Sequence, residues 1–355
     1  NFGKLSAILE YFSCPEEAFF APAIVVEDMR QKLREKGIKI TDRDVEAILS
    51  SRNRDVLMKS LQFLKERRIE YVTILDEAYP DKLRHIYDPP LILYLKGKPL
   101  PGDKKSIAVV GARNCSVYGR EIGEYLAKAI AKEDIIIISG LARGVDSHAH
   151  MGALAAGGST YAVLGCGIDI CYPAENINLY MDMQNNGGII SEYGPGIKPL
   201  SYHFPMRNRI ISALSDGILV IEAGEKSGSL ITVDMGLDQG KNIYAVPGRI
   251  TDKLSKGCNN LIKMGAKVVT SPADILEDLV DYYAAGELEQ HNMKKLLNEE
   301  ERTVYEILGF TPMHIEEISV LSKIQPAKLM EHLLSLELKD LVRQCTKNFY
   351  IRRQG

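Results

Sequence analysis

Four loops rich in glycine, arginine or small hydroxyl residues hold most of the side chains able to do chemistry in this chain of 355 residues. The first two read V-V-G-A-R-N-C-S-V-Y-G and S-G-L-A-R-G-V-D-S-H-A-H. Their candidate binding residues are Gly111, Arg113, Tyr118, Gly119, Gly140, Arg143 and Gly144. Glycine lets backbone amides approach an anion, and a guanidinium binds two phosphate oxygens at once. Both loops are therefore typical of phosphate binding.

The other two loops read F-P-M-R-N-R-I-I and E-A-G-E-K-S-G-S-L-I-T. They add the candidates Arg207, Asn208, Arg209, Gly224, Lys226, Ser227, Gly228 and Ser229. Neither the dinucleotide fingerprint G-x-G-x-x-G nor the P-loop spacing G-x-x-x-x-G-K-[ST] is present. Four such loops favour an extended polyanion over one mononucleotide, although Arg207 and Arg209 also fit ordinary exposed arginines.

The same loops offer little for catalysis. Asp146, Ser147 and His148 are consecutive, whereas the members of a catalytic triad must point at one another. We expect Asp146 to cap the helix that follows it. Glu222 is equally consistent with a general base and with an acceptor of loop amides. The sequence predicts no enzyme, no catalytic residue, no cofactor and no metal site.

Short apolar segments that alternate with amphipathic helices must position these loops. The predicted strands are 107–110, 135–138, 161–164, 189–191, 218–221, 243–246 and 267–269. The predicted helices between them include 119–132, 230–238 and 273–281. Continuously apolar strands indicate a parallel sheet covered on both faces, so we predict a doubly wound, Rossmann-like α/β domain over residues 71–283. Ligands of such sheets bind at the carboxyl ends of the strands, where these loops lie.

Smaller domains flank the predicted sheet. Residues 1–70 show helical spacing and predict a helix-hairpin or SAM-like domain, and residues 30–70 carry 12 basic and 7 acidic residues. Residues 284–297 are a predicted linker. Residues 298–355 predict a winged helix, with helices at 299–309, 314–322 and 326–339 before a hairpin. Winged helices bind DNA or proteins, and both alternatives stay open here.

Composition describes an ordinary globular protein. The chain has 44 Lys and Arg against 47 Asp and Glu, a net charge of −3, and 45% apolar residues. No apolar run approaches membrane-spanning length, and the first residues do not resemble a signal peptide. Six cysteines without a Cys-x-x-Cys pair fit reduced thiols. We expect a cytoplasmic protein without a membrane partner.

The order of these motifs resembles the DNA-processing protein A family, DprA or Smf, over about residues 105–267. Further matching segments are Y-A-V-L-G-C-G-I-D, S-E-Y-G-P-G, A-V-P-G and G-C-N-N-L-I-K-M-G-A. The resemblance implies a single-stranded DNA-binding recombination mediator that protects incoming DNA during natural transformation. It implies that the mediator helps to load the RecA recombinase on strands coated by single-strand-binding protein, and that the core forms a homodimer.

Carried over by motif, the resemblance implies DNA contacts at Gly111, Arg113, Gly140, Arg143, Gly144, Arg207, Asn208, Arg209 and the 224–229 loop. We expect Tyr118, Tyr172, Tyr202 and Phe204 either to stack on bases or to pack at the surface. Two other functions remain as alternatives. A Rossmann-like nucleotide hydrolase would need P-G-G-x-G-T where this chain has S-G-S-L-I-T. The winged helix would otherwise act alone, as a duplex-DNA-binding or scaffold module.

Overall fold

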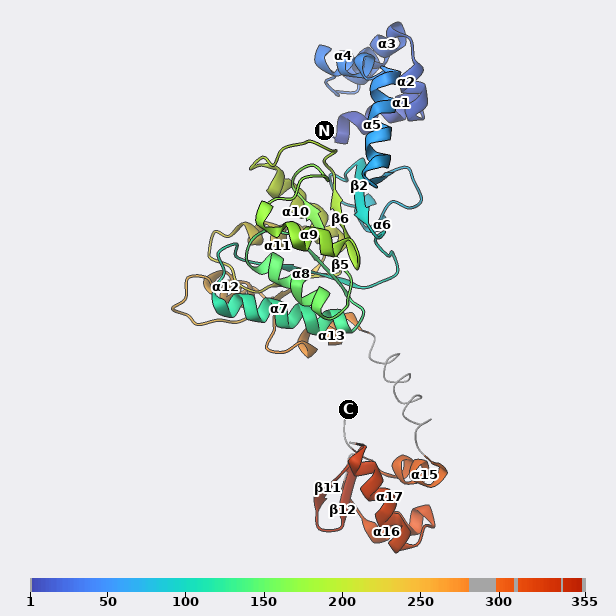
Figure 1. Ribbon diagram of the computed structural model, residues 1–355, viewed down its shortest axis with the longest axis vertical. Helices are drawn as coiled ribbons and strands as arrows, with labels where there is room; N and C mark the ends of the chain where they lie inside the picture. The colour runs from blue at the N-terminus through green and yellow to red at the C-terminus, as the bar shows by residue number, and fades with distance from the viewer. Residues whose placement is uncertain (1, 281–297, 310–311, 340, 353–355) are drawn as a thin grey trace. The chain divides into compact units, whose positions relative to one another are not determined.

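The computed structural model describes residues 2–280, 298–309, 312–339 and 341–352 (Figure 1). Its contacts divide the chain into two units, Asn1–Leu279 and Val280–Gly355. The predicted linker 284–297 lies outside the described residues. No helix in the described part is both long and apolar enough to cross a membrane.

A nine-stranded sheet, in the order β1-β2-β6-β5-β4-β3-β7-β8-β9, forms the centre of the first unit. All seven predicted strands are present and parallel, each within two residues of its predicted limits. They are β3 (Ser106–Val110), β4 (Ile136–Ser139), β5 (Thr160–Leu164), β6 (Gly187–Ser191), β7 (Gly217–Val220), β8 (Asn242–Ala245) and β9 (Lys267–Val268). The predicted doubly wound fold is confirmed.

Two strands were not predicted. β1 (Glu70–Thr73) and β2 (Ile92–Gly97) pair antiparallel, and β2 extends the sheet beyond β6. β1 (E-Y-V-T) lacks the continuous apolar run that marks the parallel strands, whereas β2 begins with the apolar residues I-L-Y-L, of which Leu93 is fully buried. The short α6 (Asp81–Arg84) lies between them.

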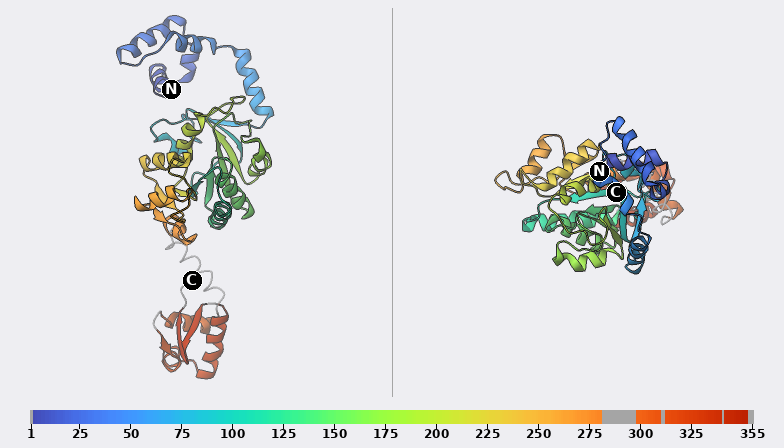
Figure 2. Two further views of the ribbon diagram at one scale, coloured as in Figure 1. Left: turned by 90° about the vertical axis from the view of Figure 1, so that its left-hand side faces the viewer. Right: turned by 90° about the horizontal axis from the view of Figure 1, so that it is seen from above.

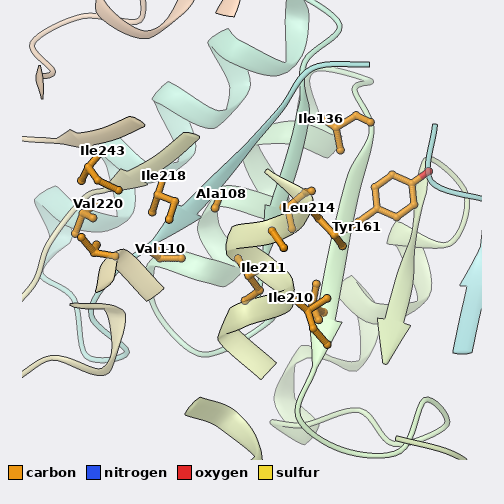
Figure 3. Packing of buried hydrophobic residues seen from close by; sticks show 14 of the residues in the cluster. Ala108, Val110, Ile136, Tyr161, Ile210, Ile211, Leu214, Ile218, Val220 and Ile243 are labelled. Carbon is orange, nitrogen blue, oxygen red and sulfur yellow. The ribbon is translucent and has the colours of Figure 1, made fainter. Parts of the chain in front are cut away.

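Helices cover both faces of the sheet (Figure 2). On one face α7 (Val117–Lys132) packs against α8 (Val145–Ala155), and on the other α10 (His203–Leu214) packs against α11 (Gly228–Asp238). The remaining helices of the sheet domain are α9 (Ile177–Met183), α12 (Lys256–Lys263) and α13 (Ala273–Leu279). Figure 3 shows Ile210, Ile211 and Leu214 of α10 in one apolar cluster with Ala108 and Val110 of β3. This packing fixes the second half of α10 against the central strand β3.

Strand order creates a crevice beside β3. From β3 the chain proceeds through β4, β5 and β6 on one side, and then returns to β7, β8 and β9 on the other. The connections after β3 and β7 therefore leave the sheet toward opposite faces. In open α/β sheets such a switch point is where ligands bind.

Five helices precede the sheet, in agreement with the helical prediction for residues 1–70. They are α1 (Phe2–Phe12), α2 (Pro15–Phe20), α3 (Ala23–Glu35), α4 (Asp42–Ser50) and α5 (Arg54–Glu66). α1 to α4 enclose their own apolar cluster around Val26, Met29 and Leu33. Phe63 and Leu64, near the end of α5, pack instead against the sheet domain.

The second unit has the predicted order of a winged helix. It contains α15 (Glu299–Ile307), β10 (Met313–His314), α16 (Ile315–Ser322), α17 (Pro326–Leu338), β11 (Val342–Thr346) and β12 (Phe349–Arg352). β10 adds a third strand to the predicted hairpin, in the order β10-β12-β11. Glu301 links α15 to α17 through Lys339, 2.8 Å away, and through the Ser335 hydroxyl.

Candidate nucleic-acid interface

A crevice of about 550 Å³ opens at the switch point between β3 and β7. The loop after β3, the loop after β7 and the first half of α10 line it. It brings together nine of the predicted residues: Gly111, Arg113, Arg207, Asn208, Gly224, Lys226, Ser227, Gly228 and Ser229. Segments that are more than 100 residues apart in sequence thus form one surface.

A smaller hollow of about 60 Å³ shares Arg113, Phe204 and Arg207 with the crevice. Gly140 and Arg143 line it together with Tyr172. The remaining predicted residues, Tyr118, Gly119, Gly144 and Arg209, line neither depression. The predicted binding residues therefore form a continuous surface only in part.

Arg113 and Lys226 present free positive charge to the crevice. Both side chains are exposed, and neither forms an ion pair with a described carboxylate. The Arg113 guanidinium lies 5.4 Å from the centre of the Phe204 ring. Its loop is held in place because the Ala112 amide donates to the Glu222 carbonyl at 2.8 Å. Both cations are thus available to an anion without loss of an internal ion pair.

The structure corrects the expected role of Arg207. Its side chain is buried, and its Nη1 donates to the carbonyl oxygens of Gly140, at 2.9 Å, and Val163. Burial lowers the pKa of Arg207 to about 10. A Cβ at Gly140 would collide with the guanidinium, so this glycine makes room for Arg207. Arg207 forms the floor of the crevice and leaves the exposed contacts to other side chains.

Arg209 also differs from the prediction. Its two terminal nitrogens donate to the Glu192 carboxylate at 2.8 and 2.7 Å, and its Nε donates to the Asp88 carbonyl at 2.8 Å. Asn208, the residue between the two arginines, lines the crevice. Successive residues of a helix point about 100° apart, which explains why Arg207 and Asn208 reach the crevice while Arg209 turns away from it toward Glu192.

Two buried carboxylates stabilise the loops. Glu222 accepts hydrogen bonds from the Ser116 amide at 2.8 Å and from its hydroxyl at 2.6 Å. Of the two roles open for Glu222, this geometry favours the acceptor of loop amides. A Cβ at Gly119 would collide with the same carboxylate, so this glycine serves the packing of Glu222.

Asp146 was expected to cap α8, and this prediction was wrong. The capping position is Gly144, whose φ of +75° favours glycine. Asp146 instead accepts the amides of Gly140, at 3.1 Å, and Ala142, at 3.4 Å. Burial raises the pKa of Asp146, while the nearby Arg207 opposes this shift.

The loop before α11 offers hydroxyls and amides to the crevice. Ser227 caps the helix by accepting the Ser229 amide, and the two hydroxyl oxygens lie 2.7 Å apart. A Cβ at Gly228 would meet nothing within 4 Å, so no internal contact requires glycine there. The open space lies at the first turn of an 11-residue helix, where unpaired amides favour an anion.

Arg143 is exposed and paired. Its Nε and Nη2 each lie 2.8 Å from an oxygen of Glu175. An exposed ion pair of this kind contributes only about 0–1 kcal/mol, so a phosphate can compete with Glu175. Tyr172, 46% exposed, lies beside this pair with its ring 5.4 Å from that of Phe204.

One contributing segment was not predicted. Leu254, from the loop between β8 and α12, lines the crevice. The segment A-V-P-G-R-I-T-D-K-L follows a predicted strand at the same edge. Reading every loop at this edge, rather than only the most glycine-rich ones, would have included it. Among the described residues, no group of three or more His, Cys, Asp or Glu side chains is arranged to hold a metal.

Comparison with known proteins places this fold and crevice in a family. The family model for DNA recombination-mediator protein A matches residues 70–280, and the model for the DprA winged-helix domain matches residues 294–346. The chain belongs to the DNA recombination-mediator protein A family. The matched region contains every strand of the sheet and every residue of the crevice.

Curated relatives of this family are similar in sequence over the same region. The DNA processing protein DprA of Streptococcus pneumoniae is 46% identical over 206 residues, which are 58% of this chain and 73% of the relative. The Bacillus subtilis protein of the same name is 41% identical over 224 residues, 63% of this chain and 75% of the relative.

Solved structures of the family share the fold. The S. pneumoniae DprA structure matches with a TM-score of 0.58 and 39% identity, covering 72% of this chain and 92% of that one. A Helicobacter pylori DNA processing protein A, described for its single-stranded DNA binding mode, matches with a TM-score of 0.54 and 30% identity. This second match covers 59% of this chain and 96% of that one.

Proposed function

We propose that this chain is a recombination mediator that binds single-stranded DNA in the crevice between β3 and β7, and that it is not an enzyme. The observation that carries the proposal is the pair of unpaired cations, Arg113 and Lys226, beside the open first turn of α11. Members of its family bear the name of recombination mediators, and the H. pylori relative is described as binding single-stranded DNA.

The chemistry of the crevice suits a DNA backbone. Guanidinium, ammonium, hydroxyl and amide groups contact phosphates, which carry no sequence information. Binding through them is independent of sequence and falls steeply with salt, with a slope of about −0.7 per phosphate neutralised on a single strand. The alternative of a nucleotide hydrolase loses support because Glu222 and Asp146 already accept loop amides and are not free to act as bases.

Further partners follow from family membership. We propose that the chain protects incoming strands during natural transformation, helps to load a RecA-type recombinase on strands coated by single-strand-binding protein, and forms a homodimer. All six cysteines are unpaired. Free thiols support placement in the reducing cytoplasm.

A fluorescence titration tests the proposal. A labelled thymidine homopolymer and its duplex counterpart are titrated with the full chain at low and moderate salt. We expect tighter binding to the single strand and a steep salt slope. The absence of binding to either form would reject the proposal, and release of free base from mononucleotides would favour a hydrolase instead.

A further inference from the structure

The loop between β8 and α12 is anchored beside the crevice. The Leu254 carbonyl accepts the Ala223 amide at 2.7 Å, which ties the end of the loop to the loop after β7. At its start, Gly248 exchanges two hydrogen bonds with the Asn259 side chain, at 3.2 and 3.0 Å. These contacts hold residues 249–253 in a defined position at the carboxyl edge of the sheet.

The tip of this loop exposes two cations around an apolar side chain. Ile250 is 88% exposed, and Arg249 and Lys253 are exposed as well. Neither cation forms a hydrogen bond through its side chain or an ion pair with the described residues, and the intervening Asp252 pairs with neither. A single exposed isoleucine is common on protein surfaces. Its position between two free cations at a ligand-binding edge is what distinguishes this one.

The tip continues a row of cations along the sheet edge. Strands β4, β3, β7 and β8 are neighbours in the sheet. The loops that follow them carry Arg143, Arg113, Lys226, and then Arg249 with Lys253. Adjacent strands lie ~4.8 Å apart, so the row spans about 14 Å. A single strand of DNA that lies across the crevice and extends toward β8 would next reach the tip of this loop.

We infer that the tip of the β8–α12 loop is an additional binding site for single-stranded DNA. Arg249 and Lys253 contact backbone phosphates beyond the crevice, and Ile250 packs against the face of a base. This inference rests on the proposed function, because it extends the path of the same bound DNA from the loop after β7 to the loop after the neighbouring β8.

A charge-removal experiment tests the phosphate contacts. The full-length double variant Arg249→Ser/Lys253→Ser is titrated with a labelled thymidine oligomer of about 20 nucleotides. We expect affinity at low salt to fall about tenfold and the salt slope to become shallower by about 1.4, two phosphates at about 0.7 each. The matched control Lys128→Ser/Lys132→Ser removes two exposed positive charges from α7 and should bind like the original chain.

A single tryptophan tests the base contact independently. The chain contains no tryptophan. Ile250→Trp therefore introduces one indole at an exposed position, and stacking of a base on it quenches its fluorescence. Tyr125→Trp, at an exposed position on α7, is the control and should not respond.

The outcomes separate this inference from the proposed function. Quenching of the indole in Ile250→Trp that saturates with the binding curve, together with the weaker binding and shallower salt slope of the charge-removal variant, supports the inference. Normal binding by both double variants and no quenching would overturn it while leaving DNA binding in the crevice intact. If the unmodified chain does not bind the oligomer, the proposed function itself fails.

Discussion

Two parts of this chain have folds that bind DNA in many proteins, and they expose opposite chemistry. The carboxyl edge of the sheet presents unpaired cations, hydroxyls and an open helix N-terminus. In the winged helix, α17 occupies the position of the recognition helix and exposes Met330, Leu334 and Leu338, at 49%, 59% and 82%. Because function depends on the exposed side chains and not on the fold class, we expect the sheet edge, and not the winged helix, to bind a polyanion.

The lysines of α17 form ion pairs with carboxylates of α15. Lys328 pairs with Glu300 at 2.6 Å, and Lys339, at the end of the helix, pairs with Glu301 at 2.8 Å. Both carboxylates belong to α15, so these pairs hold the winged helix together. Glu331 and Glu337 are exposed on α17, and their negative charges repel phosphates. Of the two alternatives open from the sequence, the exposed surface favours protein contact.

The largest expected effect is on stability, and it distinguishes the buried Arg207 from the exposed Arg113. Arg207→Ala removes the buried donor to the Gly140 and Val163 carbonyls and the positive charge near Asp146, so we expect the free energy of unfolding to fall by about 3–5 kcal/mol. Urea denaturation measures this change. The double variant Arg207→Met/Asp146→Asn removes the unpaired charge and should recover part of the loss. Stability equal to the original chain in Arg207→Ala would show that Arg207 is not a structural residue.

A smaller effect is expected on binding alone. Arg113→Ala should weaken single-stranded DNA binding by about 1–3 kcal/mol, because a charge-assisted contact is lost. Its thermal stability should stay unchanged, since Arg113 has no internal ion pair. Anisotropy titration at low salt measures the affinity, with Lys132→Ala as the control. Unchanged affinity would remove Arg113 from the interface.

A pH effect is expected in the winged helix. Burial raises the pKa of Glu301, but hydrogen bonds from Lys339, Ser335 and the Asn298 amide outweigh it and lower the pKa to about 2. Ionised Glu301 therefore stabilises the folded state above its unfolded pKa, near 4.5, on the order of 2 kcal/mol. This contribution is lost as the pH falls from 4.5 toward 2.

Thermal melts of the full chain and of Glu301→Gln at several pH values measure the loss. The two chains should converge as the pH falls, because protonation makes Glu301 resemble glutamine. A constant difference between them at every pH would contradict the assignment.

The smallest expected effect is on binding after removal of the winged helix. A chain that ends at Leu279 should bind single-stranded DNA within about twofold of the full chain, because the free cations of the edge are retained. Anisotropy titration compares the two chains. Complete loss of binding would show that the winged helix, and not the sheet edge, binds the DNA.

The sequence predicted the fold better than the roles of its charged side chains. Apolar runs located all seven parallel strands because a strand buried on both faces must be apolar throughout. β1 is an edge strand and has no such run, whereas β2 pairs with both β1 and β6 and begins with I-L-Y-L, an apolar signal that the prediction did not use. The internal roles of Arg207 and Arg209 were not predicted, because a charge pattern in a helix does not reveal which side chain turns inward. Only the partners that other segments bring, Gly140 and Glu192, distinguish them from Arg113.

Amide hydrogen exchange of the full chain, with and without a saturating thymidine oligomer, distinguishes DNA binding at the sheet edge from binding at the winged helix. We expect slower exchange in the loops after β3 and β7 and in the tip at 249–253, with no change in α17. Protection confined to α17, with the loops of the sheet edge unchanged, would contradict it.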